Sequence, residues 1–326
     1  MDAADAMGLW WIANAASDAG DLPTCEAMLD RALKRFEADE DQWGVAAVLA
    51  ARAKHAHVRA DLPALYDSAC ESITIFRALG DRWGVLQATG WFGAHAELVG
   101  DFDEAQRLHL EGVQAAEELG LWPEVASALG MLGWTSIRQA DYESARTYGE
   151  RALRLATEQG QRATQALAEL VLGFAARRTG ALDEASERLQ ALIDAARLQK
   201  ESVLYLSIVL EELGFVRELQ GRPEDALRLH TEAFQVSVDF DSLRGMCWAL
   251  EGIAACHPDK TLAAVLLGCA AATRASKNYL MAATETEDLD RAVAAAGVLG
   301  ESAYETAYAR GATLSPAEAF ALLVRQ

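Results

Sequence analysis

The stretch DQWGV at Asp41–Val45 returns as DRWGV at Asp81–Val85, 40 residues further along the chain. Related segments begin at the same interval, near residues 1, 41, 81, 121, 161, 201 and 242. Self-similarity with a period of about 20–50 residues is typical of arrays in which each repeat packs only against its neighbours. The sequence therefore predicts a stacked helical array rather than one globular core.

Each unit has the spacing of two helices joined by a short turn. In the third unit we expect a first helix over Arg82–Val99 and a second over Asp103–Leu119, with glycines at the ends of both. Glycine just past a helix adopts the left-handed conformation without a Cβ penalty. The same punctuation is expected at Gly20, Gly80, Gly100, Gly120, Gly160, Gly180 and Gly221, with Ala60 and Ala140 in its place in two turns.

Two columns of small residues run through the units. A glycine inside a helix costs about 1 kcal/mol relative to alanine, so its return in successive units indicates that two helices approach closely there. The first-helix column is Gly93, Gly133, Gly173 and Gly214, and the second-helix column is Ala105, Ala145, Ala185 and Ala226.

With these columns the chain resembles the tetratricopeptide repeat (TPR) family. The unit is 40 residues long rather than the family's usual length of about 34, and the proline that ends the family's repeat is absent. The resemblance implies an all-α, right-handed superhelical solenoid of about seven TPR-like helix-turn-helix repeats. It rests on ALGMLGW (Ala128–Trp134), LVLGF (Leu170–Phe174) and EELGF (Glu211–Phe215) in first helices, and on DFDEA (Asp101–Ala105) and DYESA (Asp141–Ala145) in second helices.

We predict two regions, a repeat array over residues 1–276 and a C-terminal helical cap over residues 277–326. A cap is expected because the open end of a solenoid exposes a hydrophobic face. Ser315, Pro316 and Glu318 have the pattern of a capping box at a helix start. The units are 1–40, 41–80, 81–120, 121–160, 161–200, 201–241 and 242–276, and the last helices are expected over Leu262–Ser276, Glu285–Leu299, Glu301–Arg310 and Pro316–Val324.

The C-terminal segment carries a more specific resemblance. LAAVLLGCAAATRA (Leu262–Ala275) and AYETAYARGATLSPAEAFALL (Ala303–Leu323) are similar to the end of the repeat region in large bacterial LuxR-type and AfsR-like regulators. In that family the repeats are the sensor region, and an ATPase domain and often a DNA-binding domain lie on the same chain. This sequence contains no GxxxxGK[ST] phosphate loop and no helix-turn-helix with basic flanks. The resemblance therefore implies only the sensor, with the other domains on a longer parent chain.

Composition and charge exclude several functions. The net charge of −20 argues against direct nucleic-acid binding and against anionic membrane surfaces. Five cysteines without a CxxC pair indicate reduced thiols, and no signal peptide is expected at Met1–Gly8, so we predict a cytoplasmic protein. We find no HExxH, GxSxG or GxGxxG motif, and therefore expect no catalytic residues, no metal ligands, no cofactor and no enzyme activity.

Candidate binding residues follow from the fold, because the first helix of each TPR-like unit lines the concave side. Aromatic residues one position after the glycine column form a possible ladder, with charged residues beside it. Aromatic residues at this spacing are also common in the core between helices, and arginines at this position can simply be solvated. The candidates are Trp134, Phe174 and Phe215, with Arg138, Arg177 and Glu218 beside them, and Lys54, His57 and Glu97 in earlier units.

These features favour a non-catalytic regulatory binding module that takes a small molecule, a peptide or a protein partner in its concave groove. On the resemblance to the bacterial regulators, it would be the sensor part of a transcriptional regulator. Two alternatives stay open, a stand-alone scaffold that assembles proteins, and an enzyme or sequestration protein that binds a small molecule on the repeat scaffold.

Overall fold

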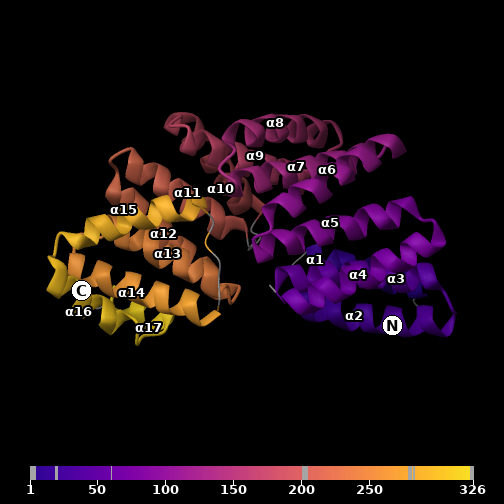
Figure 1. Ribbon diagram of the computed structural model, residues 1–326, viewed down its shortest axis with the longest axis horizontal. Helices are drawn as coiled ribbons and strands as arrows, with labels where there is room; N and C mark the ends of the chain where they lie inside the picture. Colours follow the sequence, from indigo (N-terminus) through magenta and orange to yellow (C-terminus); the bar gives the residue numbers. More distant parts are fainter. Residues whose placement is uncertain are drawn as a thin grey trace. The chain divides into compact units, whose positions relative to one another are not determined.

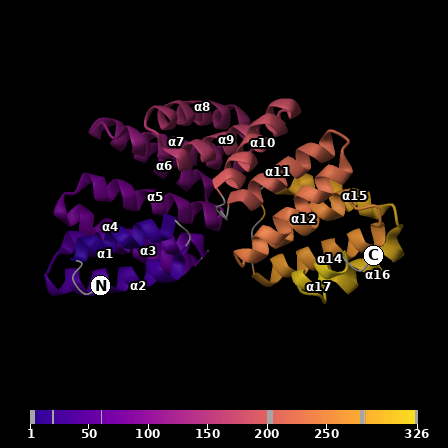
Figure 2. The ribbon, with the colours of Figure 1, turned by 180° about the vertical axis from the view of Figure 1, so that it is seen from behind.

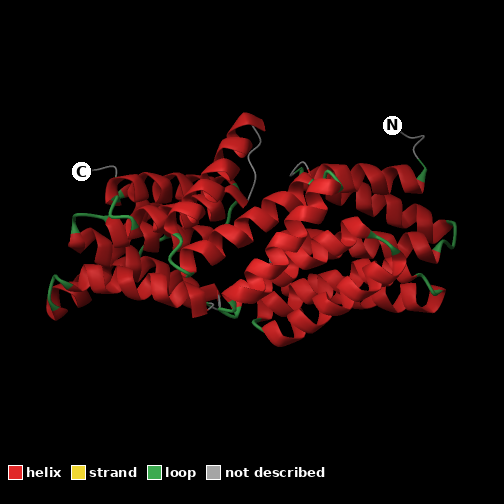
Figure 3. Cartoon of the chain, turned by 90° about the horizontal axis from the view of Figure 1, so that it is seen from above, coloured by secondary structure: helices red, strands yellow, loops and turns green. Residues whose placement is uncertain are grey.

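The computed structural model describes residues 5–18, 21–59, 61–199, 205–277, 281 and 283–323. Across these residues the chain forms helices and turns, and no strand is present (Figure 3). The predicted all-α fold class is therefore confirmed. The predicted turn residues Gly20 and Ala60 lie outside the described residues. In the same part of the chain, no helix is both long enough and apolar enough to cross a membrane.

The chain divides into two compact units, Met1–Thr135 with Arg151–Thr164, and Ser136–Glu150 with Gln165–Gln326. The division passes through the consecutive helices α7, α8 and α9. The helices up to this point are α1 (Ala6–Asp18), α2 (Leu22–Ala38), α3 (Gln42–Val58), α4 (Leu62–Leu79), α5 (Arg82–Val99), α6 (Phe102–Leu119), α7 (Trp122–Arg138), α8 (Tyr142–Glu158) and α9 (Arg162–Arg178) (Figure 1).

The remaining helices belong to the second unit. Helix α5 has the bounds that the sequence predicted, and α6 begins one residue earlier than predicted. The predicted division between array and cap, after residue 276, stays a prediction. The helices are α10 (Leu182–Gln199), α11 (Tyr205–Leu219), α12 (Pro223–Asp239), α13 (Leu243–Cys256), α14 (Lys260–Lys277), α15 (Ala283–Gly297), α16 (Glu301–Gly311) and α17 (Pro316–Ala321).

The repeated DxWG stretch starts the first helix of its unit. Asp41 and Asp81 are N-caps, whose carboxylates accept the backbone N–H groups of Gly44 at 3.0 Å and Gly84 at 2.9 Å. A Cβ on Gly84 would lie 2.2 Å from the Phe76 ring, and Gly44 meets Phe36 in the same way. The aspartate therefore fixes the helix start, and the glycine makes room for an aromatic ring of the preceding helix.

The glycines of the first-helix column likewise make room for a side chain, here between the two helices of one repeat. A Cβ on Gly93 would lie 2.5 Å from the His109 ring, and a Cβ on Gly173 would lie 2.9 Å from Leu189. In both cases the obstructing side chain belongs to the second helix of the same repeat. The predicted close approach of the two helices is therefore present at these positions.

Successive helices turn through the same backbone conformation. The φ angle is positive at Gly80, Gly100, Gly120, Gly160, Gly180 and Gly221, which lie about 20 or about 40 residues apart. Three non-glycine residues hold the same left-handed position, namely Glu40, Ala140 and Asp241. The turns therefore keep the same backbone geometry at positions where glycine is replaced by another residue.

The C-terminal helices pack on the last repeat pair of the second unit. Helices α13 and α14 contact each other, and α15 packs on both. Helices α16 and α17 lie beside α14 (Figure 2). Gly268 and Gly311 let α14 and α16 touch through their backbones, since a Cβ on Gly268 would lie 2.0 Å from the Tyr308 carbonyl oxygen. Ser315 and Glu318 form the capping box that the sequence predicted for α17.

Candidate functional site: an arginine cluster occupied by helix α15

Four arginines of the second unit face the carboxylates of one helix, α15. Arg138 is the last residue of α7, Arg177 and Arg178 end α9, and Arg244 lies in the first turn of α13. We call these four residues the arginine cluster. Each of them is placed by a repeat helix, whereas α15 comes from the end of the chain, so the cluster is assembled from three separate helices, α7, α9 and α13.

Asp288 is the centre of this contact. Both Asp288 carboxylate oxygens accept from Arg177, at 2.9 Å from Nη1 and 3.1 Å from Nη2. The second oxygen also accepts from Arg178 Nη2 at 2.6 Å. The three side chains are between 1% and 4% exposed, so this paired arrangement is closed to water. Two-pronged Arg–carboxylate contacts fix orientation as well as charge.

The same guanidinium is held from its other side by the repeat array. Arg177 Nε and Nη2 each donate to a carboxylate oxygen of Glu212 at 2.6 Å. Glu212 comes from α11, and its side chain is fully buried. Glu212 therefore orients the Arg177 guanidinium independently of α15. The guanidinium presents its remaining N–H groups to Asp288.

Glu285 forms the second contact of α15 with the cluster. Its Oε1 accepts from Arg138 Nη1 at 2.7 Å and from Arg244 Nη2 at 2.6 Å. At the periphery Glu287 pairs with Arg178 at 2.8 Å, although the Glu287 side chain is 66% exposed. Arg291 of α15 contributes in the opposite sense, donating to Glu218 of α11 at 3.2 Å. Charge complementarity thus extends over two turns of α15.

The protonation of the acidic groups follows from these contacts. Burial by itself raises the pKa of Asp288, but Arg177, Arg178 and Arg291 together hold it below its ordinary value. Burial also acts to raise the pKa of Glu285, but the charges of Arg244, Arg138 and Arg274 outweigh this effect. The pKa of Glu285 is therefore lowered as well. Both carboxylates that α15 places on the cluster are therefore ionised at neutral pH.

Five of the predicted site residues lie in this region. Arg138 and Arg177 belong to the arginine cluster, and Glu218 pairs with α15. Phe174 and Phe215 are 4% and 1% exposed, and their ring centroids lie 6.5 and 6.1 Å from that of Trp248. The Arg177 guanidinium also lies 5.2 Å from the centre of the Phe215 ring, within range of a cation–π contact.

The other predicted residues lie in the first unit. The Glu97 side chain is 9% exposed, accepts a hydrogen bond from the Thr135 hydroxyl, and lies 3.6 Å from His109 Nε2. The His57 ring centroid is 5.9 Å from that of Trp91, and burial lowers the pKa of His57. Lys54 and Trp134 are partly buried. These four residues belong to the other compact unit, and their role in binding stays a prediction.

Sequence reasoning missed Glu285, Asp288 and Arg291, because their partners on α7, α9, α11 and α13 lie 41 to 147 positions away in the sequence. The available signal was the acidic run Glu285–Asp290 in a helix that was expected only to close the array. Among the described residues, no three histidine, cysteine, aspartate or glutamate side chains gather as metal ligands would.

A second buried pair of titratable groups joins α11 and α12, and burial raises the pKa of its carboxyl group, Glu211, to about 7. His230 Nδ1 of α12 is 2.6 Å from Glu211 Oε2 of α11, and both side chains are at most 1% exposed. Burial alone would lower the pKa of His230, but the Glu211 charge and hydrogen bonds raise it to about 10. The histidine also fills the space that Gly214 and Gly252 leave open, so the pair has a packing role as well.

Comparison with known proteins supports the fold. Residues 85–158 match the family model of the tetratricopeptide repeat. No curated protein sequence matches the chain. A Rap protein solved in complex with competence and sporulation factor is similar in structure, with a TM-score of 0.63 and 13% identity over 98% of this chain and 86% of that chain.

Two further solved structures share the fold. NprR in complex with its cognate peptide NprX is 13% identical, with a TM-score of 0.53, over 92% of this chain and 80% of that chain. The signal transduction ATPase with numerous domains and a tetratricopeptide repeat sensor from Pyrococcus horikoshii has a TM-score of 0.52 and 13% identity. There the match covers 88% of this chain and 41% of that chain. At such identities these likenesses show a TPR-like helical fold.

Proposed function

We propose that this chain is a regulatory binding module whose arginine cluster recognises a short acidic segment of a peptide or partner protein. In the structure described above, α15 of the same chain occupies that site. A partner that presents carboxylates at the spacing of Glu285 and Asp288 would replace α15 and shift the chain between two states. The contacts around Asp288, in which Arg177 and Arg178 of α9 bind a carboxylate of α15, carry this proposal.

The geometry favours an acidic peptide over other ligands. The Arg177 guanidinium is already oriented by Glu212, so little side-chain freedom is lost when a carboxylate binds. A carboxylate one helical turn away, at the position of Glu285, meets Arg138 and Arg244. Two solved structures with the same fold, the Rap protein and NprR, are complexes with a signalling factor and a cognate peptide, respectively, which supports a peptide ligand here.

The test uses α15 itself as the probe. A fluorescein-labelled peptide with the sequence of residues 283–297 is titrated with the wild-type chain and with the double variant Glu285→Gln, Asp288→Asn. The variant removes both charges of the built-in helix and keeps its shape. We expect the peptide to bind the variant about tenfold more tightly than the wild type, because the wild-type site is already occupied.

The matched control is Asp290→Asn, which removes a carboxylate from the exposed side of the same helix. It should bind the peptide as weakly as the wild type does. A peptide that itself carries Asp288→Asn should lose its affinity for the double variant. Equal binding to the double variant and to the Asp290→Asn control, with both chains folded by circular dichroism, contradicts the proposal.

A finer part of the proposal is that the module is the sensor of a transcriptional regulator. The similarity to the sensor-bearing ATPase from Pyrococcus horikoshii supports it. The measurement is the mass of the endogenous protein, detected with an antibody against this chain. A species well above 35.1 kDa is expected if the module is fused to effector domains, and a species at 35.1 kDa contradicts the fused form.

A further inference from the structure

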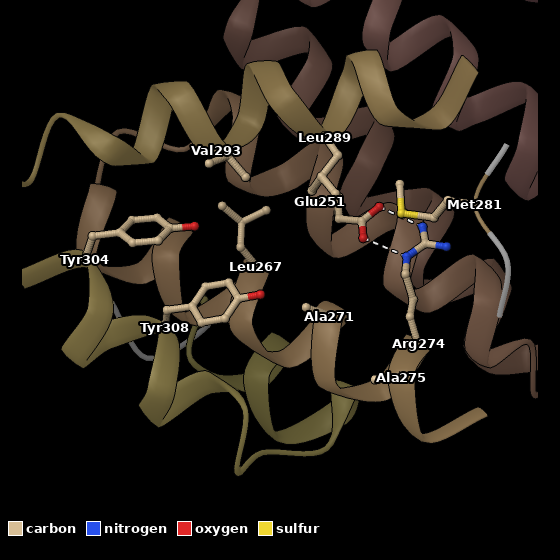
Figure 4. A pocket seen from close by; sticks show the side chains of 10 residues that line it. All are labelled: Glu251, Leu267, Ala271, Arg274, Ala275, Met281, Leu289, Val293, Tyr304 and Tyr308. Atoms are coloured by element: carbon tan, nitrogen blue, oxygen red, sulfur yellow. Dashed lines mark hydrogen bonds and ion pairs between the residues drawn. The ribbon is translucent and has the colours of Figure 1, made fainter. Parts of the chain in front are cut away.

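A cavity of about 580 Å³ lies within the second unit, bounded by α13, α14, α15 and α16 (Figure 4). Its wall is mainly apolar, and Leu267, Leu289, Val293 and Met281 line it. The volume falls within the range of about 300–1,000 Å³ that is typical of small-molecule sites. The cavity is separate from the arginine cluster, although α15 contributes residues to both.

The helix packing explains why the cavity exists at this place. Gly268 and Gly311 bring the backbones of α14 and α16 into contact, and a Cβ on Gly311 would lie 1.9 Å from the Val265 carbonyl oxygen. This contact fixes α16 at one side of the space. One turn further along α14, Ala271 presents only a methyl group to the cavity, so the gap between α14 and α15 stays unfilled.

Two tyrosine hydroxyls provide the polar groups at one end. Tyr304 and Tyr308 lie one turn apart on α16 with ring centroids 5.6 Å apart, and Figure 4 shows both hydroxyls on the side facing Leu267. Neither hydroxyl has a hydrogen-bond partner within the part of the chain that the structure describes. Burial raises the pKa of both phenols, so each remains a donor at neutral pH.

The opposite end of the cavity is charged but internally paired. Arg274 donates to both carboxylate oxygens of Glu251, from Nε at 2.8 Å and from Nη2 at 2.7 Å. In Figure 4 this pair closes the wall beside Met281. The pair leaves no net charge at this end, so an ionic ligand would be desolvated without gaining a counter-ion. Arg274 Nη1 is buried and has no hydrogen-bond partner within the described part of the chain.

We propose that this cavity is a binding site for a small, uncharged and largely apolar molecule that carries a carbonyl or hydroxyl oxygen. The apolar wall takes the body of the molecule, and the Tyr304 and Tyr308 hydroxyls donate to its oxygen. The proposal does not depend on the acidic-peptide function, since none of the cluster arginines lines the cavity.

The probe for the test is prodan, an uncharged naphthyl ketone whose emission moves to shorter wavelength in apolar surroundings. We expect saturable binding of one prodan per chain with blue-shifted emission. In the variant Ala271→Phe, a phenyl ring fills the space beside α14, and binding should be lost. The matched control is Ala294→Phe, which adds the same ring on the exposed side of α15 and should leave binding unchanged.

A second variant keeps the test decisive if Ala271→Phe fails to fold. Tyr304→Phe with Tyr308→Phe retains both rings and removes only the two donors, so the affinity for prodan should fall by about tenfold. Unsaturable binding, or unchanged affinity in the folded Ala271→Phe chain, overturns the site. Unchanged affinity in the double tyrosine variant overturns the assigned recognition of an oxygen acceptor.

Discussion

At the scale of single residues, the most constrained group is the Arg177 guanidinium. Its Nε, Nη1 and Nη2 all donate to carboxylates, which come from one repeat helix and from α15. A buried charge is tolerated only when it is paired and hydrogen-bonded. The side chains of Glu212 and Asp288 are buried, so water cannot replace the guanidinium as their partner. The residue therefore contributes to the stability of the second unit, and in the proposed function it is the group that selects acidic partners.

We expect Arg177→Ala to lower the free energy of unfolding of the second unit by about 3–5 kcal/mol, because it leaves Glu212 buried without its ion-pair partner and removes one of the arginines that bind Asp288. Urea unfolding followed by circular dichroism measures the change. Arg197→Ala is the control, since Arg197 pairs with Glu232 at the surface with exposed fractions of 51% and 39%. It should change the free energy by less than about 1 kcal/mol, and equal effects of the two substitutions would contradict the buried assignment.

The histidines provide a prediction about pH. The pKa of His230 is raised to about 10, chiefly by Glu211 acting against burial, whereas burial lowers the pKa values of His57 and His95. In NMR titrations of the imidazole resonances, His57 and His95 should lose their protons below pH 6.5. His230 should remain protonated beyond neutrality. A His230 resonance that titrates at or below pH 6.5 contradicts the charged pair with Glu211.

At the scale of helices, close approach is set by glycine in two different ways. Gly93 and Gly173 accommodate side chains, which can shift slightly, whereas Gly268 and Gly311 face carbonyl oxygens of a neighbouring helix backbone. A backbone cannot move aside without displacing its whole helix. The α14–α16 contact is therefore the less forgiving of the two arrangements, and it also sets one wall of the cavity.

Gly268→Ala should destabilise the second unit by about 1–3 kcal/mol, because the added methyl group pushes α16 away from α14. Gly90→Ala is the control, since a Cβ at Gly90 in α5 meets nothing within 4 Å. That substitution should be neutral or stabilising by up to about 1 kcal/mol, as alanine is the better helix former. The comparison is made by urea unfolding, and a neutral Gly268→Ala would show that α16 does not pack as described.

The sequence predicted the repeat helices well because their signals are local. Asp caps, turn glycines and the small-residue columns each act within one or two turns of a helix, so the bounds of α5 and the start of α17 followed directly. The position of α15 could not be predicted in this way. The pairing of Asp288 with Arg177 joins residues 111 positions apart, and no periodic pattern links them.

The candidate site likewise shows that local sequence signals do not predict contacts between distant residues. Arg138 and Arg177 were predicted from their place after the glycine column, and the structure puts both at the ends of first helices. What the pattern did not contain was their partner, a helix of the same chain. The role of the predicted residues in binding an external ligand stays a prediction.

At the scale of the whole molecule, the two compact units differ in their tryptophan content. Seven of the eight tryptophans lie in the first unit, and Trp248 lies in the second. Stability in repeat proteins is a sum of local and neighbour contributions, so damage in one unit need not spread through the other. Tryptophan fluorescence thus reports mainly on the first unit, whereas circular dichroism reports on the helices of both units.

In a Trp248→Phe background, fluorescence reports on the first unit alone. We expect Arg177→Ala added to that background to leave the fluorescence-detected urea midpoint unchanged, while part of the circular dichroism signal is lost at lower urea. The reason is that every ion pair of Arg177 lies inside the second unit. If both signals shift together, the two units unfold as one cooperative block.

The left-handed turns have a consequence for how such a chain grows. Gly80, Gly120 and Gly160 hold the same backbone conformation at intervals of 40 residues, and Glu40 and Ala140 reach it without glycine. A duplicated segment that runs from one of these turns to the next therefore has the same backbone conformation at both ends, whichever residue occupies the turn. Gene duplication, or a designer, can lengthen the array in whole repeats without having to invent a new junction.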